Sequence, residues 1–505
     1  MTLSSASIRT AILITLLAPG LASSQSLTKS LTHRLNQAPF DRHHWGVAVL
    51  DERGRLLFGH NAERLFTPAS NTKLIVTGAA TMLLGPDTTV RTPVYLDGPV
   101  EQGTLRGNLI LYGNGDATWA RRCYAVDTLA AGACLTDPFA PLRPIATALK
   151  RVGVRQVSGQ VIGDGSFFEP ITYHPTWEIG DLVWGYGAPV SGLGFNENTI
   201  QATIRPGPTP GALASIALWP DLGALTVENR LITVPDSERT EIDWARGPDG
   251  VTAVVTGTIR ASERERRNTL AAPDPNRFTA LALHQVLADS GIVVLGGVSG
   301  TTDPLATQAA RRGQPVAEIV SRPIRDWVFP VLNVSQNWVA EMLLKLLGKR
   351  FESEGSWQAG LRVERRFLID VVGADSTQFS IQDGSGLSAQ NSVSPLTFAR
   401  LLAFMQRQPQ YAAFAAGMPQ SGSVGSLRNR FLATPVAERV WAKTGSIAQV
   451  NSLSGYIGGT TLGEPHCRIF SVQAMNHILG GQTMIRAIDS VVSDIGAQSR
   501  CNVKR

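Results

Sequence analysis

The pattern of apolar and polar residues predicts a β-hairpin near the start of the chain, followed by a helix. In "WGVAVLDERGRLLF", residues 45–58, two apolar runs flank a polar turn that contains Gly54. From Lys73 to Leu84 apolar residues recur every three or four positions, and "GPD" at 85–87 is typical of a helix end. This pattern places Ser70 at the start of the predicted helix.

Between residues 91 and 319 the pattern changes to short runs of Val, Ile and Leu that Gly, Pro and Asp interrupt, which predicts strands. One helical pattern, "NRFTALALHQVLADSG" at 276–291, lies within this region. A helical period returns at 321–348, and the chain ends with strand-like runs and a helical pattern at 483–496. We therefore expect residues 91–319 to form one or two inserted strand-rich domains, with their internal boundaries left open.

The first 24 residues have the pattern of a secretory signal peptide. Arg9 precedes the apolar run "AILITLLAPGLA", and small residues stand before Gln25. The run is too short to span a bilayer, and no later stretch has 18 uninterrupted apolar residues. We expect a soluble mature chain that is exported to the periplasm.

Composition and charge narrow the class of protein further. With 505 residues and 43% hydrophobic content, the chain can bury several cores. The net charge is +6 for the full chain and +5 without residues 1–24, which contain Arg9 and no acidic residue; this excess fits adhesion to an anionic polymer such as cell wall, and it fits solubility alone equally well. The sequence contains no dense run of Lys and Arg with interleaved aromatic residues, so nothing in it indicates a nucleic-acid partner.

Four cysteines in an oxidising compartment predict two disulfides. Cys123 and Cys134 bracket a short loop, and Cys467 and Cys501 lie near the end of the chain, so we pair them in this way among three possible connectivities. No HExxH or CxxC motif occurs, so we expect neither a metal nor another cofactor.

Ser70 and Lys73 are three residues apart, so on a helix they lie on one face. This pair is either a nucleophile with its base, or a helix cap followed by a solvated lysine. Ser26 and Lys29 have the same spacing, but no hairpin precedes them.

Two more motifs favour the catalytic interpretation, namely Ser335-Gln336-Asn337 and Lys443-Thr444-Gly445-Ser446. A Lys-Thr-Gly tripeptide is expected by chance roughly 0.1 times in such a chain, and the three motifs follow the order found in SxxK acyl-transferases. A lysine can take a proton from serine only as the free amine, so burial and nearby positive charge must lower its pKa. Lys443 would add a cation suited to a substrate carboxylate.

On these motifs the sequence resembles the penicillin-binding proteins of the D-alanyl-D-alanine carboxypeptidase/endopeptidase family, class C low-molecular-mass type, peptidase family S13. Further stretches carry the resemblance: "LYGNGDATW" (111–119), "GDGSFF" (163–168), "YGAPVSGLGFNEN" (186–198) and "DGSGLSAQNSVSP" (383–395). The resemblance implies an α/β fold of the serine β-lactamase/transpeptidase type, an antiparallel sheet with helices on both faces. Residues 25–90 and 320–505 would form this catalytic domain, split by the insertion at 91–319.

The resemblance also implies roles for residues of the motifs. Ser70 would be the acylated nucleophile and Lys73 its base, Ser335 would pass a proton to the leaving amine, and Asn337 would orient the site. The terminal carboxylate of the substrate would be bound by Lys443 and Thr444, while Gly445 would keep the strand open to the substrate.

Two assignments concern the surroundings of these residues. The backbone N–H groups of Ser70 and Ser446 could form an oxyanion hole. Asp164 in "GDGSFF" matches an aspartate that, in the family, reaches the amine of diaminopimelate; the same residues are also typical of a turn. We interpret Asp383 and Ser385 as turn residues.

The expected function is therefore that of an exported serine D-Ala-D-Ala carboxypeptidase, with possible endopeptidase action. Its substrates would be peptidoglycan stem peptides, and β-lactam antibiotics would acylate and inhibit it. The alternative is a peptidoglycan-binding protein that keeps the fold without turnover. The sequence contains no G-x-S-x-G elbow, the motif that would indicate another class of serine hydrolase.

Overall fold

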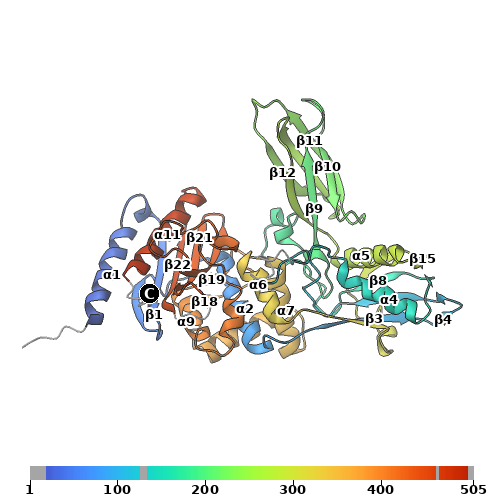
Figure 1. Cartoon of the computed structure of the whole chain (residues 1–505), viewed down its shortest axis with the longest axis horizontal. Helices are drawn as coiled ribbons and strands as arrows, with labels where there is room; N and C mark the ends of the chain where they lie inside the picture. Colours follow the sequence, from blue (N-terminus) through green and yellow to red (C-terminus); the bar gives the residue numbers. More distant parts are fainter. Residues whose placement is uncertain (1–18, 126–133, 462–465, 499–505) are drawn as a thin grey trace, which may run out of the picture.

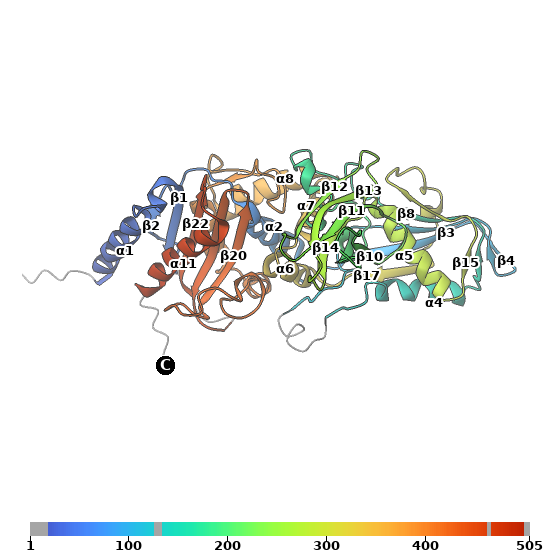
Figure 2. The ribbon, with the colours of Figure 1, turned by 90° about the horizontal axis from the view of Figure 1, so that it is seen from above.

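The structure, a computed structural model, describes residues 19–125, 134–461 and 466–498. A five-stranded sheet lies toward one end of the elongated molecule and the strands of the 91–320 segment lie toward the other (Figure 1). A narrow arm of strands projects from this segment (Figure 1). In both views three helices lie between the two parts (Figure 1, Figure 2), namely α2 (Lys73–Ala79), α6 (Ile324–Asn333) and α7 (Asn337–Glu352).

The five-stranded sheet joins segments from near both ends of the chain. Its order is β2-β1-β22-β21-β20, and each neighbouring pair is antiparallel. The predicted hairpin is confirmed as β1 (His44–Asp51) and β2 (Leu56–His60). Trp45 of β1 lies opposite Ala474 of β22. The other three strands are β20 (Val440–Ile447), β21 (Val450–Gly458) and β22 (His466–Met475).

Helices cover both faces of this sheet, because β1 presents apolar side chains to each side in alternation. Val47 and Val49 pack in one core with side chains of α1 (Pro19–Leu35) and α11 (Gly481–Ala497). Ala48 and Leu50 pack in a second core with side chains of α2 and of α9 (Pro395–Met405). The expected antiparallel sheet with helices on both faces is confirmed.

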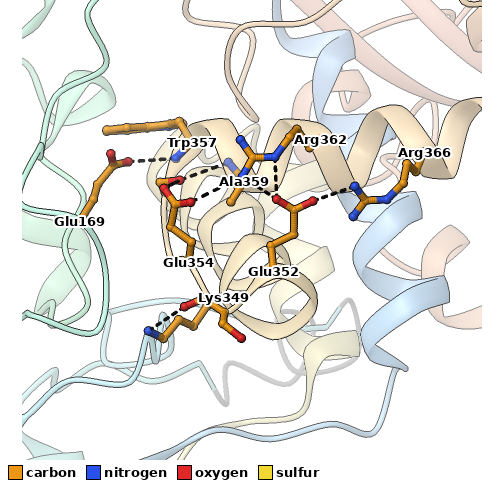
Figure 3. Close-up of polar contacts among 10 residues, drawn as sticks. Glu169, Lys349, Glu352, Glu354, Trp357, Ala359, Arg362 and Arg366 are labelled. Atoms are coloured by element: carbon orange, nitrogen blue, oxygen red, sulfur yellow. Dashed lines mark hydrogen bonds and ion pairs between the residues drawn. The ribbon is translucent and has the colours of Figure 1, made fainter.

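A network of polar contacts fixes the turn between α7 and α8 (Trp357–Arg366), as Figure 3 shows. Glu352 at the end of α7 forms ion pairs with Arg362 and Arg366 at 2.5 and 2.7 Å. Glu169, from the 91–320 segment, accepts a hydrogen bond from the backbone N–H of Trp357 at 2.9 Å. This turn therefore also attaches the 91–320 segment to α8.

The strands between residues 91 and 320 pair only with one another in the described part of the chain. They form two sheets beside α4 (Arg143–Arg151) and α5 (Pro275–Asp289), and two three-stranded sheets in the arm. This pairing supports the predicted insertion, whose exact limits stay a prediction. In chain order the strands are β3 (Arg91–Asp97), β4 (Val100–Glu101), β5 (Thr104–Leu105), β6 (Asn108–Tyr112), β7 (Gln156–Val157), β8 (Val161–Asp164), β9 (Thr199–Arg205), β10 (Ser215–Trp219), β11 (Thr226–Val234), β12 (Glu241–Arg246), β13 (Thr252–Arg260), β14 (Arg266–Ala271), β15 (Val293–Val294), β16 (Val298–Thr301) and β17 (Ala317–Val320).

The predicted helices at 276–291 and 483–496 correspond to α5 and α11. Two further short elements lie after residue 320: the helix α10 (Tyr411–Ala415), and a two-stranded sheet of β18 (Phe379–Ser380) and β19 (Ser392–Val393).

The predicted signal peptide, residues 1–24, lies mostly outside the described residues, and only its last residues belong to α1. Leu27, Leu31 and Leu35 of α1 are buried in the core that α11 shares. Cleavage after residue 24 would leave these contacts in place. Within the described ranges, no helix combines the length and the apolar character needed to cross a membrane.

The predicted Cys123–Cys134 disulfide is present, with 4.3 Å between the two Cα atoms. Cys501 lies outside the described residues, so the predicted Cys467–Cys501 bridge stays a prediction.

Candidate active site

Ser70 and Lys73 lie where the chain enters the helix predicted from the sequence. A 3-10 turn (Ala69–Thr72) leads into α2, and a π-helical segment (Ala80–Leu84) ends it. Lys73 Nζ is 2.9 Å from Ser70 Oγ. Lys73 is fully buried, so the alternative of a helix cap followed by a solvated lysine is wrong.

The 3-10 turn is held against the sheet by side chains of β21. Asn71 donates a hydrogen bond to Ser454 Oγ at 2.9 Å, and Ser452 Oγ donates to the carbonyl of Pro68 at 2.7 Å. These bonds fix the position of Ser70 relative to the strands.

Lys73 Nζ has two further partners, Asn337 Oδ1 at 2.7 Å and the backbone carbonyl of Ser385 at 2.6 Å. Burial lowers the pKa of Lys73 to about 7, although the carboxylates of Asp383 and Glu341 act in the opposite direction. A substantial share of Lys73 is therefore the free amine near neutral pH.

Ser335 lies in the turn between α6 and α7, and Asn337 is the first residue of α7. Ser335 has a positive φ of 64°, and the Gln336 side chain accepts a hydrogen bond from the N–H of Val339, capping α7. Asn337 donates through Nδ2 to the carbonyl of Tyr186 at 2.9 Å. This contact brings the stretch at 186–198 to the site and sets the orientation of the Asn337 amide.

Lys443 on β20 is fully buried, and its Nζ donates to Ser335 Oγ and to the carbonyl of Thr444, both at 2.8 Å. Burial lowers the pKa of Lys443 well below its usual range, and the charge of Lys73 adds to this effect. Thr444 Oγ1 donates to Ser426 Oγ at 3.0 Å. The structure thus brings all three motifs together.

The structure gives a packing reason for Gly445 beside the role that the resemblance implies. A Cβ atom at this position would lie 2.6 Å from the carbonyl oxygen of Pro68 and 2.2 Å from Ser452 Oγ. Glycine therefore lets β20 approach the 3-10 turn that carries Ser70, in addition to any role in leaving the strand open to a substrate.

Sequence reasoning missed the side chains and backbone groups that surround the motif residues. Ser446 Oγ accepts a hydrogen bond from Asn451, whose Oδ1 lies 2.9 Å from His477 Nε2. Asp383 does form a turn, since it accepts the N–H of Gly386 at 2.8 Å, but the same turn supplies the Ser385 carbonyl to Lys73. No pattern in a single sequence predicts the contact of Ser446 with Asn451 or that of the Ser385 carbonyl with Lys73.

Asp164 is not in contact with the motif residues. It ends β8, is fully buried, and accepts hydrogen bonds from Thr307 Oγ1 and from the N–H of Ser166. Arg311 Nε lies 3.7 Å from its carboxylate. In the described part of the chain, no group of His, Cys, Asp and Glu side chains is arranged to hold a metal ion.

The sequence matches the model of the D-Ala-D-Ala carboxypeptidase 3 (S13) family over residues 27–492. A D-alanyl-D-alanine carboxypeptidase of Actinomadura sp. (strain R39) is 27% identical over 427 residues, which are 82% of this chain and 75% of that protein. The D-alanyl-D-alanine carboxypeptidase DacB of Haemophilus influenzae is 22% identical over 416 residues, 81% of each chain.

Solved structures show the same fold. Penicillin binding protein 4 (dacB) from H. influenzae has a TM-score of 0.77 at 20% identity, covering 92% of this chain and 98% of its own. A structure of that protein complexed with a β-lactam has a TM-score of 0.71 at 19% identity, covering 93% and 99%. The predicted α/β fold class is confirmed.

Proposed function

Because the chain belongs to the D-Ala-D-Ala carboxypeptidase 3 (S13) family, we propose that it is an exported serine carboxypeptidase that acts on peptidoglycan stem peptides. The observation that carries the proposal is the buried Lys73 amine 2.9 Å from Ser70 Oγ. Its pKa of about 7 makes it a base suited to neutral pH.

In the first step, Ser70 Oγ attacks the carbonyl carbon of the bond between the two terminal D-alanines, and Lys73 takes the hydroxyl proton. The C–N bond breaks, and the leaving amine of D-alanine receives a proton through Ser335. Ser335 is suited to this transfer because it is hydrogen-bonded to Lys443 Nζ. Water then hydrolyses the acyl-enzyme. A β-lactam would form the corresponding acyl-enzyme on Ser70.

The terminal carboxylate of the substrate would be bound by Lys443 and Thr444, which lie on β20 beside Ser335. An extended stem peptide could pair with the same strand. The N–H groups of Ser70 and Ser446 would stabilise the oxyanion. In a cross-linked substrate the leaving amine belongs to a second stem peptide, whereas in a carboxypeptidase substrate it belongs to a free D-alanine. The bond that is cleaved is otherwise the same, so the proposal includes endopeptidase action on cross-links.

Benzylpenicillin labelling tests the proposal directly. Intact-mass spectrometry of the mature protein should show one adduct, which maps to the tryptic peptide Leu65–Lys73, whose only serine is Ser70. The same preparation should release D-alanine from an uncross-linked muropeptide and cleave a cross-linked one. An adduct on Ser26 would contradict the assignment, and labelling without product from either muropeptide would favour the non-catalytic peptidoglycan-binding protein.

Asp164 is tested separately, since its role as an amine-binding residue is a prediction from resemblance. Asp164→Asn should lower kcat/KM about 3–10-fold for a stem peptide with a free diaminopimelate amine, because a partly compensated charge pair is lost. A peptide with that amine acetylated should be affected less. An equal loss for both peptides would indicate that Asp164 serves only to hold Thr307 and Arg311.

A further inference from the structure

Helix α7 carries two side chains that reach toward Lys73, one turn apart. Asn337 contacts Lys73 directly, whereas Glu341 is fully buried behind it. The Glu341 carboxylate accepts hydrogen bonds from the N–H of Ser385 at 2.7 Å, the N–H of Gly384 at 3.0 Å and Nε1 of Trp357 at 2.8 Å. Three donors meet one carboxylate, which offsets part of the cost of burying its charge.

Ser385 connects Glu341 to Lys73 through its backbone. Its N–H donates to Glu341, and its carbonyl accepts from Lys73 Nζ at 2.6 Å. The turn that contains it is rigid on the other side as well, because Asp383 accepts from the N–H groups of Gly386 and Ser388. The position of the Ser385 carbonyl is therefore set by Glu341 on one side of the turn and by Asp383 on the other, and only Glu341 binds the N–H of Ser385 itself.

The Ser385 carbonyl occupies one of the N–H protons of Lys73 and so helps to decide where the lone pair of the amine points. A neutral lysine amine has two N–H protons and one lone pair. The Ser385 carbonyl can only accept, and Asn337 must present its oxygen to Lys73 because its Nδ2 donates to the carbonyl of Tyr186. Both protons are then used, and the lone pair is left for the third neighbour, the hydroxyl of Ser70.

We propose that Glu341 is a positioning residue for the general base: it holds the Ser385 peptide so that the lone pair of Lys73 points at Ser70 Oγ. This inference rests on the proposed role of Lys73 in acylation. Glu341 touches neither Ser70 nor the expected position of the substrate, and it acts only through the Ser385 peptide.

The charges around Lys73 give this role a distinct pH signature. Burial lowers the pKa of Lys73, whereas Asp383 from the turn and Glu341 from α7 raise it; Lys443 from β20 is the nearby basic group, and its own pKa is lowered by burial and by the charge of Lys73. Burial and Asp383 raise the pKa of Glu341 itself to about 7. Glu341 carries its charge mainly above about pH 7, so removing it would lower the pKa of Lys73 chiefly near and above that value, and the free amine would persist to somewhat lower pH.

The test is the second-order rate constant of acylation by benzylpenicillin, measured from about pH 5 to about pH 9 on the mature protein. In Glu341→Gln an amide N–H would face backbone N–H donors, so the turn shifts and the plateau rate should fall about 10–100-fold. At the same time the acid limb of the profile, the pH range over which the rate falls as Lys73 becomes protonated, should move to lower pH. Loss of fold alone would reduce the active fraction and leave the limb where it is.

Glu364→Gln is the matched control. Glu364 on α8 is also fully buried, and neither carboxyl oxygen has a hydrogen-bond partner among the described residues. Burial and the charges of Glu341 and Asp383 raise its pKa well above the usual range, so it is already neutral. The amide replaces it without a change of charge, and the whole pH profile should stay as in the unaltered protein.

Glu341→Asp provides a second variant that keeps the charge and withdraws the oxygens by one methylene. Its plateau should fall while its acid limb stays at the original pH, and this holds even if Glu341→Gln does not fold. An unmoved limb in Glu341→Gln, or an equal loss in Glu364→Gln, would overturn the inference. Absence of acylation in the unaltered protein would instead overturn the proposed function, and this inference with it.

Discussion

Lys73→Met is expected to slow acylation by benzylpenicillin, and release of D-alanine, by about 10²–10⁴-fold. Methionine fills the buried space of the lysine stem but has no lone pair basic enough to take the proton of Ser70. Stopped-flow or mass-spectrometric rates give the effect. The thermal midpoint should change little, because the variant no longer buries an amine but leaves Asn337 Oδ1 and the Ser385 carbonyl without the donor that Lys73 supplied.

In the unaltered protein, the pH dependence of acylation should show the same need for the free amine of Lys73. Below about pH 7 Lys73 becomes protonated and can no longer act as a base, so the acylation rate should fall as pH falls through that value. A Lys73→Met variant that retains a rate within a few-fold of the unaltered protein, or an acylation rate that rises toward acid pH, would contradict the assignment of the base.

Lys443→Ala is expected to lower kcat/KM for a free-acid carboxypeptidase substrate by roughly 10–200-fold. A hydrogen bond to a charged group contributes about 1.5–3 kcal/mol, which converts to this range. The loss should be smaller when the terminal carboxylate is amidated, since no ion pair is then removed. Steady-state kinetics on the two peptides, with both protein forms, measure the difference.

The lowered pKa of Lys443 adds a pH effect to this comparison. A bound carboxylate favours the ammonium form, so binding of the free-acid peptide takes up a proton and its KM should rise as pH rises. The amidated peptide should not show this rise. If Lys443→Ala impairs both peptides equally, the main role of Lys443 is to lower the pKa of Lys73 through charge repulsion.

The sequence predicted the elements whose signals are local. Two apolar runs around a polar turn at 45–58 predicted the hairpin, and helical spacing with a following "GPD" predicted the helix after Ser70. The three-residue spacing of Ser70 and Lys73 predicted that their side chains meet, because the geometry of one helical turn requires it.

The rest of the site depends on contacts between distant segments. The Ser385 carbonyl is a backbone group, so the residue type at this position says nothing about its contact with Lys73. Glu341 follows Asn337 by one helical turn, and this was the one sequence signal that could have placed it near the site. The reason for Gly445 became visible only when Pro68 was found beside it.

The pairing of β1 with β22 also determines the order in which the molecule can be assembled during synthesis. Chains emerge N-terminus first, so the hairpin that precedes Ser70 must wait for strands made at the far end, whereas the sheets at 91–320 are complete long before. A nascent chain that ends before Val440 already contains Ser70, Lys73, Ser335 and Asn337 but lacks β20, β21 and β22. Under the proposed mechanism, the ability to be labelled by penicillin would therefore report completion of the chain.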